Sequence, residues 1–222
     1  MNHIQKIQKT VIAAVIALGA STCVHAQFSL PSVGAVKNLV GGGSGASATD
    51  LTGQQDSLVR GYVAANKEVL NANALMAEAL GLKSDAAASA ATASSLTEGA
   101  TKDALEESNK AVAASTNAVA AELAKQPVLD ANSKALYSKG LLTLASGVTK
   151  FVGVGKNVGT MGSNLKSAPV TQLPKLQSAA YVVSNFPGSM GNVSDALKNA
   201  VAFAQSQDIP VPADATAALS AL

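Results

Sequence analysis

The side chains that most often carry catalytic or metal-binding chemistry lie near the start of this chain. His3 and His25 are its two histidines, and Cys23 is its one cysteine. Zinc sites, histidine general bases, nucleophilic triads and disulfides depend on these residue types. If the segment that holds them is removed, the remaining chain lacks the usual residues for all of these chemistries.

The first 26 residues have the order of a secretory signal peptide. Lys6 and Lys9 supply positive charge, residues 11–20 form an apolar run, and the small-residue pattern at 24–26 fits a cleavage site. This order predicts a signal peptide over residues 1–26 and export to the periplasm or the medium. The short, alanine-rich end of the signal favours a bacterial source.

Acylation of Cys23 is the alternative, because a lipoprotein signal ends directly before a cysteine. The preceding Ala20-Ser21-Thr22 lacks the large aliphatic residue and the final Gly or Ala that are usual in such signals. Cleavage after Ala26 is therefore the favoured interpretation.

Charge gives no reason to expect nucleic acid as a partner. Removal of Lys6 and Lys9 with the signal leaves 14 basic side chains against 14 acidic ones. Arg60 is the only arginine, and no stripe of Lys and Arg runs along any segment. A nearly neutral chain has little attraction for phosphate backbones.

A glycine-rich segment, residues 153–159 (GVGKNVG), superficially resembles a phosphate-binding loop. It departs from GxGxxG by one residue, and a Walker loop would not have Lys150 and Asn157 at the two flanking positions. Close helix packing or a hinge is the favoured interpretation. The candidate residues for that role are Gly153, Gly155, Gly159 and Gly162.

Two further patterns could carry chemistry. Asp103, Glu106, Glu107 and Asn109 could offer oxygen ligands to a divalent cation, but flanking lysines favour a solvated helix start. Ser-Lys neighbours such as Ser138-Lys139 do not have the one-turn spacing of a dyad. We therefore predict no catalytic residue, no metal ligand and no cofactor.

The three tyrosines, Tyr62, Tyr137 and Tyr181, fall on the apolar stripes of predicted helices. Core tyrosines with hydroxyls at the margin of a bundle would explain them. A pocket for a lipid or an aromatic ligand is the alternative.

The stretch from Ser133 to Gly162 predicts a long central helix. Apolar residues recur there every three or four positions and form a candidate interaction face, namely Tyr137, Leu141, Leu144, Val148, Phe151 and Val158. Lysines interrupt the stretch too often for a membrane span. Because glycine weakens helices, we expect this helix to fray, bend or end between Gly153 and Gly162.

Other helices should flank it. Residues 50–80 are strongly periodic and Gly81 should end them; Thr101 or Asp103 should cap a helix that stops before Pro127. After a loop at 163–169, two shorter helices should be separated by Pro187-Gly188. Residues 27–49, with the run at 41–45, should form a flexible segment with a Gly/Ser tether.

These patterns predict an all-α protein: an elongated antiparallel bundle of three or four long helices with a smaller C-terminal helical part. Residues 50–222 would form a single helical domain, with the long helices at 50–162 and the shorter ones at 163–222. We expect an exported, non-enzymatic interaction protein of the cell envelope with a protein partner. The alternative is a membrane-active or lipid- or hydrophobic-ligand-binding bundle.

Overall fold

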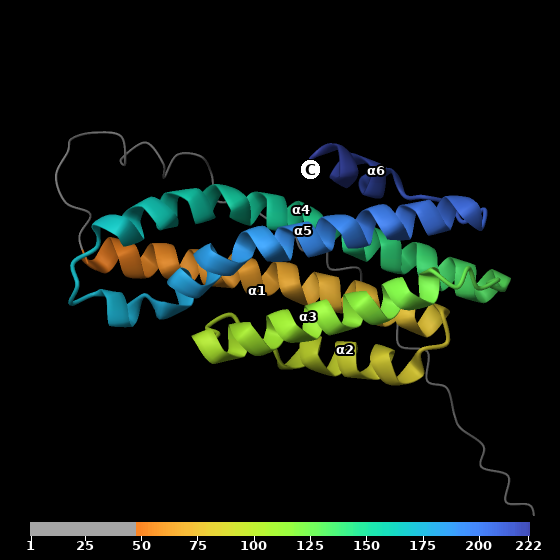
Figure 1. Ribbon diagram of the computed structural model, residues 1–222, viewed down its shortest axis with the longest axis horizontal. Coiled ribbons are helices and arrows are strands. Elements are labelled where there is room, and N and C mark those ends of the chain that lie inside the picture. Colours follow the sequence, from red (N-terminus) through yellow and green to blue (C-terminus); the bar gives the residue numbers. More distant parts are fainter. Residues whose placement is uncertain (1–47) are drawn as a thin grey trace, which may run out of the picture. The chain divides into compact units, whose positions relative to one another are not determined.

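The computed structural model describes residues 48–222 (Figure 1). In this range every regular element is a helix and no strand occurs, which confirms the all-α class. The predicted signal peptide at 1–26 and nearly all of the predicted tether segment at 27–49 lie outside the described residues.

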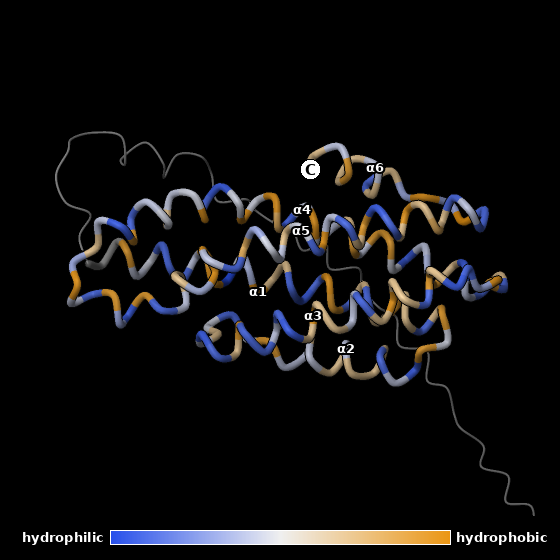
Figure 2. The backbone as a smooth tube through the Cα atoms, in the orientation of Figure 1, coloured by the Kyte–Doolittle hydropathy of each residue, from blue (hydrophilic) through white to orange (hydrophobic). Residues whose placement is uncertain are grey.

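Six α-helices and one short 3₁₀ helix make up the described part of the chain, and connections of a few residues join them. In chain order the elements are α1 (Ala48–Ala79), α2 (Lys83–Ser95), α3 (Lys102–Leu123), α4 (Ala131–Ser167), η2 (Leu173–Lys175), α5 (Gln177–Ser206) and α6 (Ala213–Ser220). Apolar and polar residues alternate along the helices (Figure 2), and the long helices α1, α3, α4 and α5 each have an apolar face suited to packing.

Gly81 ends α1, as the sequence predicts. Its φ of 81° lies in the left-handed region, which glycine adopts without a steric penalty. The amide of Leu82 donates to the Ala77 carbonyl at 2.8 Å, and the amide of Gly81 donates to the Glu78 carbonyl at 3.0 Å. This is the bond pair of a Schellman motif, and it turns the chain directly into α2.

Side chains cap the next two long helices. Thr101 Oγ1 accepts from the amide of Ala104 at 3.4 Å and begins α3. Asp130 Oδ1 accepts from the amide of Ser133 at 2.7 Å and begins α4, and this backbone bond lowers the pKa of the Asp130 carboxyl. Both residues satisfy amides that a helix start would otherwise leave unpaired.

The central pair of helices is α1 and α4. α1 contacts α2, α3, α4 and α5, and its contact with α4 is the most extensive in residues 48–222. Figure 1 shows α1 between α4 on one side and α2 and α3 on the other. The sequence predicted the helix now seen as α4 to be central, whereas α1 shares that place.

Two glycines of α4 let α1 and α4 approach closely. A Cβ added at Gly140 would lie 2.7 Å from Met76 Cγ, and one at Gly147 would lie 2.9 Å from a Val69 methyl. Position 140 therefore faces 76 and position 147 faces 69, so the two helices run in opposite directions. The seven-residue spacing puts both glycines on the same face of α4.

Of the outcomes expected for α4 between Gly153 and Gly162, fraying and an end of the helix are wrong, whereas a bend stays a prediction. The helix continues without interruption past Gly153, Gly155, Gly159 and Gly162 and ends at Ser167. Most of the segment expected to be a loop at 163–169 is therefore helical. Contacts with α5 account for part of this, because α5 packs against Gly155 and Gly162 and compensates for their low helix propensity.

The predicted break at Pro187-Gly188 is also wrong, because α5 runs through both residues. Pro187 has no N–H, so the carbonyl of Val183 receives no bond from the residue four positions on. Val182 and Val193 are both fully buried on either side of it. Burial on a common face therefore holds one 30-residue helix together where the sequence predicts two shorter ones.

Aromatic contacts fill the interior. The rings of Tyr62 and Phe151 meet edge to face with centroids 5.6 Å apart, and Tyr137 lies against Phe203 at 5.3 Å. These contacts join α1 to α4 and α4 to α5. Among the helices of residues 48–222, none combines the length and apolar character that a membrane crossing requires.

Candidate functional site

The predicted apolar face of α4 lies mostly in the core. Tyr137, Leu141, Leu144, Val148 and Phe151 are fully buried, and Val158 is partly buried. In the folded chain, the other helices already cover the five fully buried residues. They stabilise the fold, and a partner would have to contact other surfaces.

The four candidate hinge glycines fall into two classes. A Cβ at Gly155 would lie 3.3 Å from the Phe186 ring, and one at Gly162 would lie 3.3 Å from a Val183 methyl. Both glycines therefore support close contact with α5. Gly153 and Gly159 have nothing within 4 Å of such a Cβ, so packing does not require a glycine at either position.

The acidic start of α3 is a solvated helix end. Asp103 lies in its first turn, and Lys110 donates to Glu106 at 2.9 Å. That hydrogen bond and the lysine charge lower the pKa of Glu106. Within residues 48–222, no group of three or more His, Cys, Asp or Glu side chains is placed to hold a metal ion.

A hydrogen-bonded polar cluster joins α1, α3 and α5. The hydroxyl of Tyr62, which is fully buried, lies 2.7 Å from Asn109 Oδ1 and 2.7 Å from Ser189 Oγ. Asn109 Nδ2 donates to the Tyr181 hydroxyl at 3.0 Å. Buried polar groups of this kind fix the orientations of their neighbours, because a lost bond is costly away from water.

Two asparagines of α1 extend this polar contact along α3. Asn66 Nδ2 donates to Ser108 Oγ and Asn109 Oδ1, both at 3.1 Å. Seven residues later, Asn73 Nδ2 donates to Ser115 Oγ at 2.8 Å and Thr116 Oγ1 at 3.0 Å. The partners advance together by seven residues, so α1 and α3 run in the same direction.

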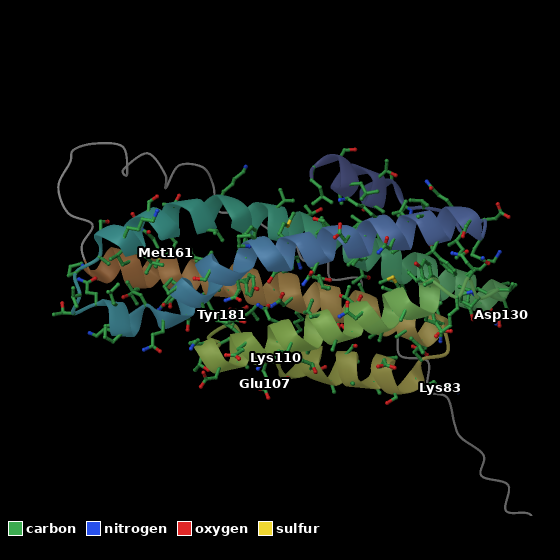
Figure 3. All side chains as sticks on the ribbon, in the orientation of Figure 1. Lys83, Glu107, Lys110, Asp130, Met161 and Tyr181 are labelled. Atoms are coloured by element: carbon green, nitrogen blue, oxygen red, sulfur yellow. The ribbon has the colours of Figure 1, made fainter. Side chains whose placement is uncertain are left out.

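The polar cluster reaches the surface at a hollow of about 530 Å³ between α3 and α5, here called the α3–α5 hollow. Figure 3 labels Lys110 and Tyr181 on the two helices that border it. Its lining is mainly polar: Glu106, Asn109, Lys110 and Ala113 from α3, and Tyr181, Asn185, Gly188, Ser189 and Asn192 from α5. This volume falls in the range of small-molecule sites.

A second surface, here called the α1–α2 groove, is mainly apolar. It has a volume of about 560 Å³ and lies where the short side chains of α2 meet α1. Glu78 and Lys83 bring opposite charges to its lining. The full lining is Asn71, Ala74, Leu75, Glu78, Lys83, Ala86, Ala87 and Ala90.

Sequence reasoning placed Tyr62 and Tyr181 on apolar stripes but did not identify their shared partner, Asn109. A signal for the cluster is present, because Asn66 and Asn73 interrupt the apolar face of α1 at a seven-residue interval. A polar residue repeated on a buried face predicts a polar partner on the facing helix. The identity of that helix depends on tertiary contacts.

Comparisons with protein-family models, curated proteins and solved structures found no match to this chain.

Proposed function

We propose that this chain is an exported, non-enzymatic interaction protein of the cell envelope, which binds a protein partner through a helical surface. The order of residues 1–26 supports export. Residues 27–222 contain neither histidine nor cysteine, which supports a role other than catalysis. The long helices each carry an apolar and a polar face, and this pattern supports binding through helices.

The α1–α2 groove is the observation that carries this proposal. Ala87 and Ala90 are exposed, and their methyl groups line the groove together with Leu75. A shallow apolar surface between two helices suits the apolar face of a third helix. Charges at Glu78 and Lys83 would add specificity at the margin of the contact.

We also propose that the long helices α1, α3, α4 and α5 form an elongated, largely antiparallel bundle. Because α5 is itself a long helix, α6 alone takes the place of the smaller C-terminal part that the sequence predicts over residues 163–222. The length and apolar spacing of the long helices support this arrangement. Small-angle X-ray scattering of residues 27–222 tests it. A radius of gyration close to that of a spherical protein of the same size would contradict the proposal.

Charge placed in the α1–α2 groove tests the binding surface. A photo-crosslinking amino acid at position 78 should give a discrete adduct with one envelope protein in native cells. The double substitution Ala87→Glu and Ala90→Glu should abolish this adduct, because binding would bury two unpaired carboxylates. Adducts would be detected by immunoblotting and identified by mass spectrometry.

The matched control is the double substitution Ala88→Glu and Ala91→Glu. These positions are exposed on the same helix but do not line the groove, so the change in charge and helix propensity is the same. The adduct should persist in this variant. Loss in both variants, loss in neither, or failure to form an adduct from position 78 would contradict the proposal.

Export has a separate test. Expression of the full chain in a Gram-negative host should yield a periplasmic or secreted protein that begins at Gln27, as shown by fractionation and N-terminal sequencing. A retained N-terminus with cytoplasmic localisation would contradict export. Acylation of Cys23, detected by mass spectrometry, would instead support the lipoprotein alternative.

A second candidate function is contact with a lipid surface, which the connection between α4 and α5 favours. Val170 is 81% exposed and Leu173 is 41% exposed. Lys166 and Lys175 lie close to them in the chain. Apolar side chains beside lysines are suited to the interface of an anionic membrane.

Liposome flotation distinguishes the two candidates. If the connection inserts, the protein should float with anionic vesicles, and the double substitution Val170→Asp and Leu173→Asp should keep it in the soluble fraction. Val128→Asp is the matched control, because Val128 is 90% exposed in a different connection. Absence of the wild-type protein from the lipid fraction would exclude the second candidate.

A further inference from the structure

Two residues of α1, on the interior side of the α3–α5 hollow, fix the orientation of Asn109 in its lining. Asn109 Oδ1 receives bonds from the Tyr62 hydroxyl and from Asn66 Nδ2, at 2.7 Å and 3.1 Å. Both donors come from α1 and are fully buried. The amide nitrogen of Asn109 must therefore point toward Tyr181, its partner at 3.0 Å. A ligand would therefore meet two groups that need little ordering, the Asn109 amide and the Tyr181 hydroxyl.

The number of hydroxyl protons decides which groups remain available. Asn109 Oδ1 has no hydrogen, so Tyr62 must donate its only proton to it. Ser189 also has a single proton, and its hydroxyl lies 2.7 Å from the Tyr62 hydroxyl and 3.1 Å from the Asn185 carbonyl, so this proton is used within the protein. Tyr181 accepts from Asn109 and keeps its own proton, which it can donate to a ligand.

Charge in the hollow favours an uncharged ligand. Glu106 and Lys110 are the charged side chains of its lining, and they pair with each other at 2.9 Å. A phosphate would compete with Glu106 for Lys110, and a cation would compete with Lys110 for Glu106. The remaining polar side chains are amides and hydroxyls, which both donate and accept hydrogen bonds.

From this geometry we propose that the α3–α5 hollow binds a small, uncharged ligand rich in hydroxyl groups, of the saccharide class. Each hydroxyl of such a ligand both donates and accepts, which matches the Tyr181 hydroxyl and the amides of Asn185 and Asn192. The hollow has the volume for one or two sugar rings. This site is separate from the α1–α2 groove and does not depend on the proposed function.

Two exposed glycines of α5 give a matched test of the site. Gly188 lines the hollow and Gly191 does not, and a Cβ at either position would have nothing within 4 Å. Gly188→Leu should fill part of the hollow, whereas Gly191→Leu makes the same chemical change outside it. Both variants should fold, because leucine favours helix more than glycine does.

The measurement is a titration of residues 27–222 with maltose and with N,N′-diacetylchitobiose, followed by amide chemical shifts. At least one disaccharide should cause saturable shifts at residues 106–113 and 181–192. Gly188→Leu should weaken binding by about tenfold or more, and Gly191→Leu should leave it within about twofold. Tyr181→Phe should weaken it through loss of the donor, while Tyr137→Phe should not.

Three results would overturn the proposal. One is that neither disaccharide gives saturable shifts in the hollow. The second is that Gly188→Leu and Gly191→Leu bind the sugar equally well, which would place binding elsewhere. The third is that inorganic phosphate binds the hollow more tightly than either disaccharide, which would show that the site selects charge.

Discussion

Tyr62 and Tyr137 are both fully buried, but their hydroxyls have different partners. The Tyr62 hydroxyl bonds to two side chains, Asn109 and Ser189, each at 2.7 Å. The Tyr137 hydroxyl donates to the backbone carbonyl of Ala200 at 3.1 Å. Removal of the Tyr62 hydroxyl therefore breaks two hydrogen bonds, although Asn109 Oδ1 keeps its bond from Asn66 and Ser189 keeps its bond to the Asn185 carbonyl. Removal of the Tyr137 hydroxyl breaks one, and the Ala200 carbonyl lies within α5, where it also has a partner in the helix.

We therefore expect Tyr62→Phe to destabilise the fold more than Tyr137→Phe. The expected losses in the free energy of unfolding are about 2–3 kcal/mol for Tyr62→Phe and about 1 kcal/mol for Tyr137→Phe. Urea unfolding followed by circular dichroism measures both. Equal losses would show that the polar cluster makes no extra contribution at Tyr62.

The same tyrosines should make stability depend on alkaline pH. Burial raises the pKa of Tyr62 and of Tyr137 above the ordinary value of 10.0. Below that value both folded and unfolded chains keep the phenolic protons, so these groups cause no pH dependence. Above it, the unfolded chain loses its protons first, so it binds fewer protons than the folded chain and stability falls as pH rises.

The free energy of unfolding should therefore decrease from about pH 10 upward, and it should decrease less steeply in Tyr137→Phe. Because lysines also titrate in this range, the comparison between the wild type and the variant isolates the tyrosine contribution. Urea unfolding at several pH values provides the slopes. The same slope in both proteins would contradict a raised pKa at Tyr137.

At the level of helices, the glycines of α4 separate into those that packing requires and those that it does not. Gly140 and Gly147 face α1, with added Cβ contacts of 2.7 Å and 2.9 Å. Gly140 would also meet the Ala72 carbonyl at 3.2 Å, a backbone atom that cannot rotate away. A Cβ added at Gly153 or Gly159 would have nothing within 4 Å.

Alanine substitution should therefore have opposite effects along this one helix. Gly140→Ala and Gly147→Ala should each lower the free energy of unfolding by about 1–3 kcal/mol, because the α1–α4 contact is overpacked. Gly153→Ala and Gly159→Ala should each raise it by up to about 1 kcal/mol through helix propensity. Chemical denaturation of the four variants checks the sign. Stabilisation by Gly147→Ala would disprove the close-approach role.

The sequence predicted which segments are helical better than it predicted where the helices end. Periodicity, the stop at Gly81 and the cap at Thr101 located α1 and α3, because these signals act locally. The continuation of α4 past its glycines and of α5 past Pro187 could not be predicted, because packing against other helices overrides local propensity there. The polar cluster was missed for the same reason, since three separate helices form it.

Across residues 48–222, the helices differ in how much large apolar surface they bury. α1 and α4 share large buried side chains such as Leu70, Tyr62 and Phe151. In α2 the buried residues are Ala86, Ser89 and Ala93. Since each buried CH₂ contributes only about 0.8 kcal/mol, the tertiary stabilisation of α2 is small. The α1–α2 groove thus adjoins a helix that packing holds weakly.

Native-state hydrogen exchange should reveal this difference as a local opening of α2. Its amides should exchange with an opening free energy at least about 2 kcal/mol below that of the α1 and α4 amides, which should report global unfolding. Gly147→Ala should lower protection in α1 and α4 and leave the local opening of α2 nearly unchanged, because that opening leaves the α1–α4 contact intact. Equal protection in α2 and α1, with equal loss on Gly147→Ala, would mean that the helices unfold as one unit. In that case a partner would meet the α1–α2 groove only in its fully packed form.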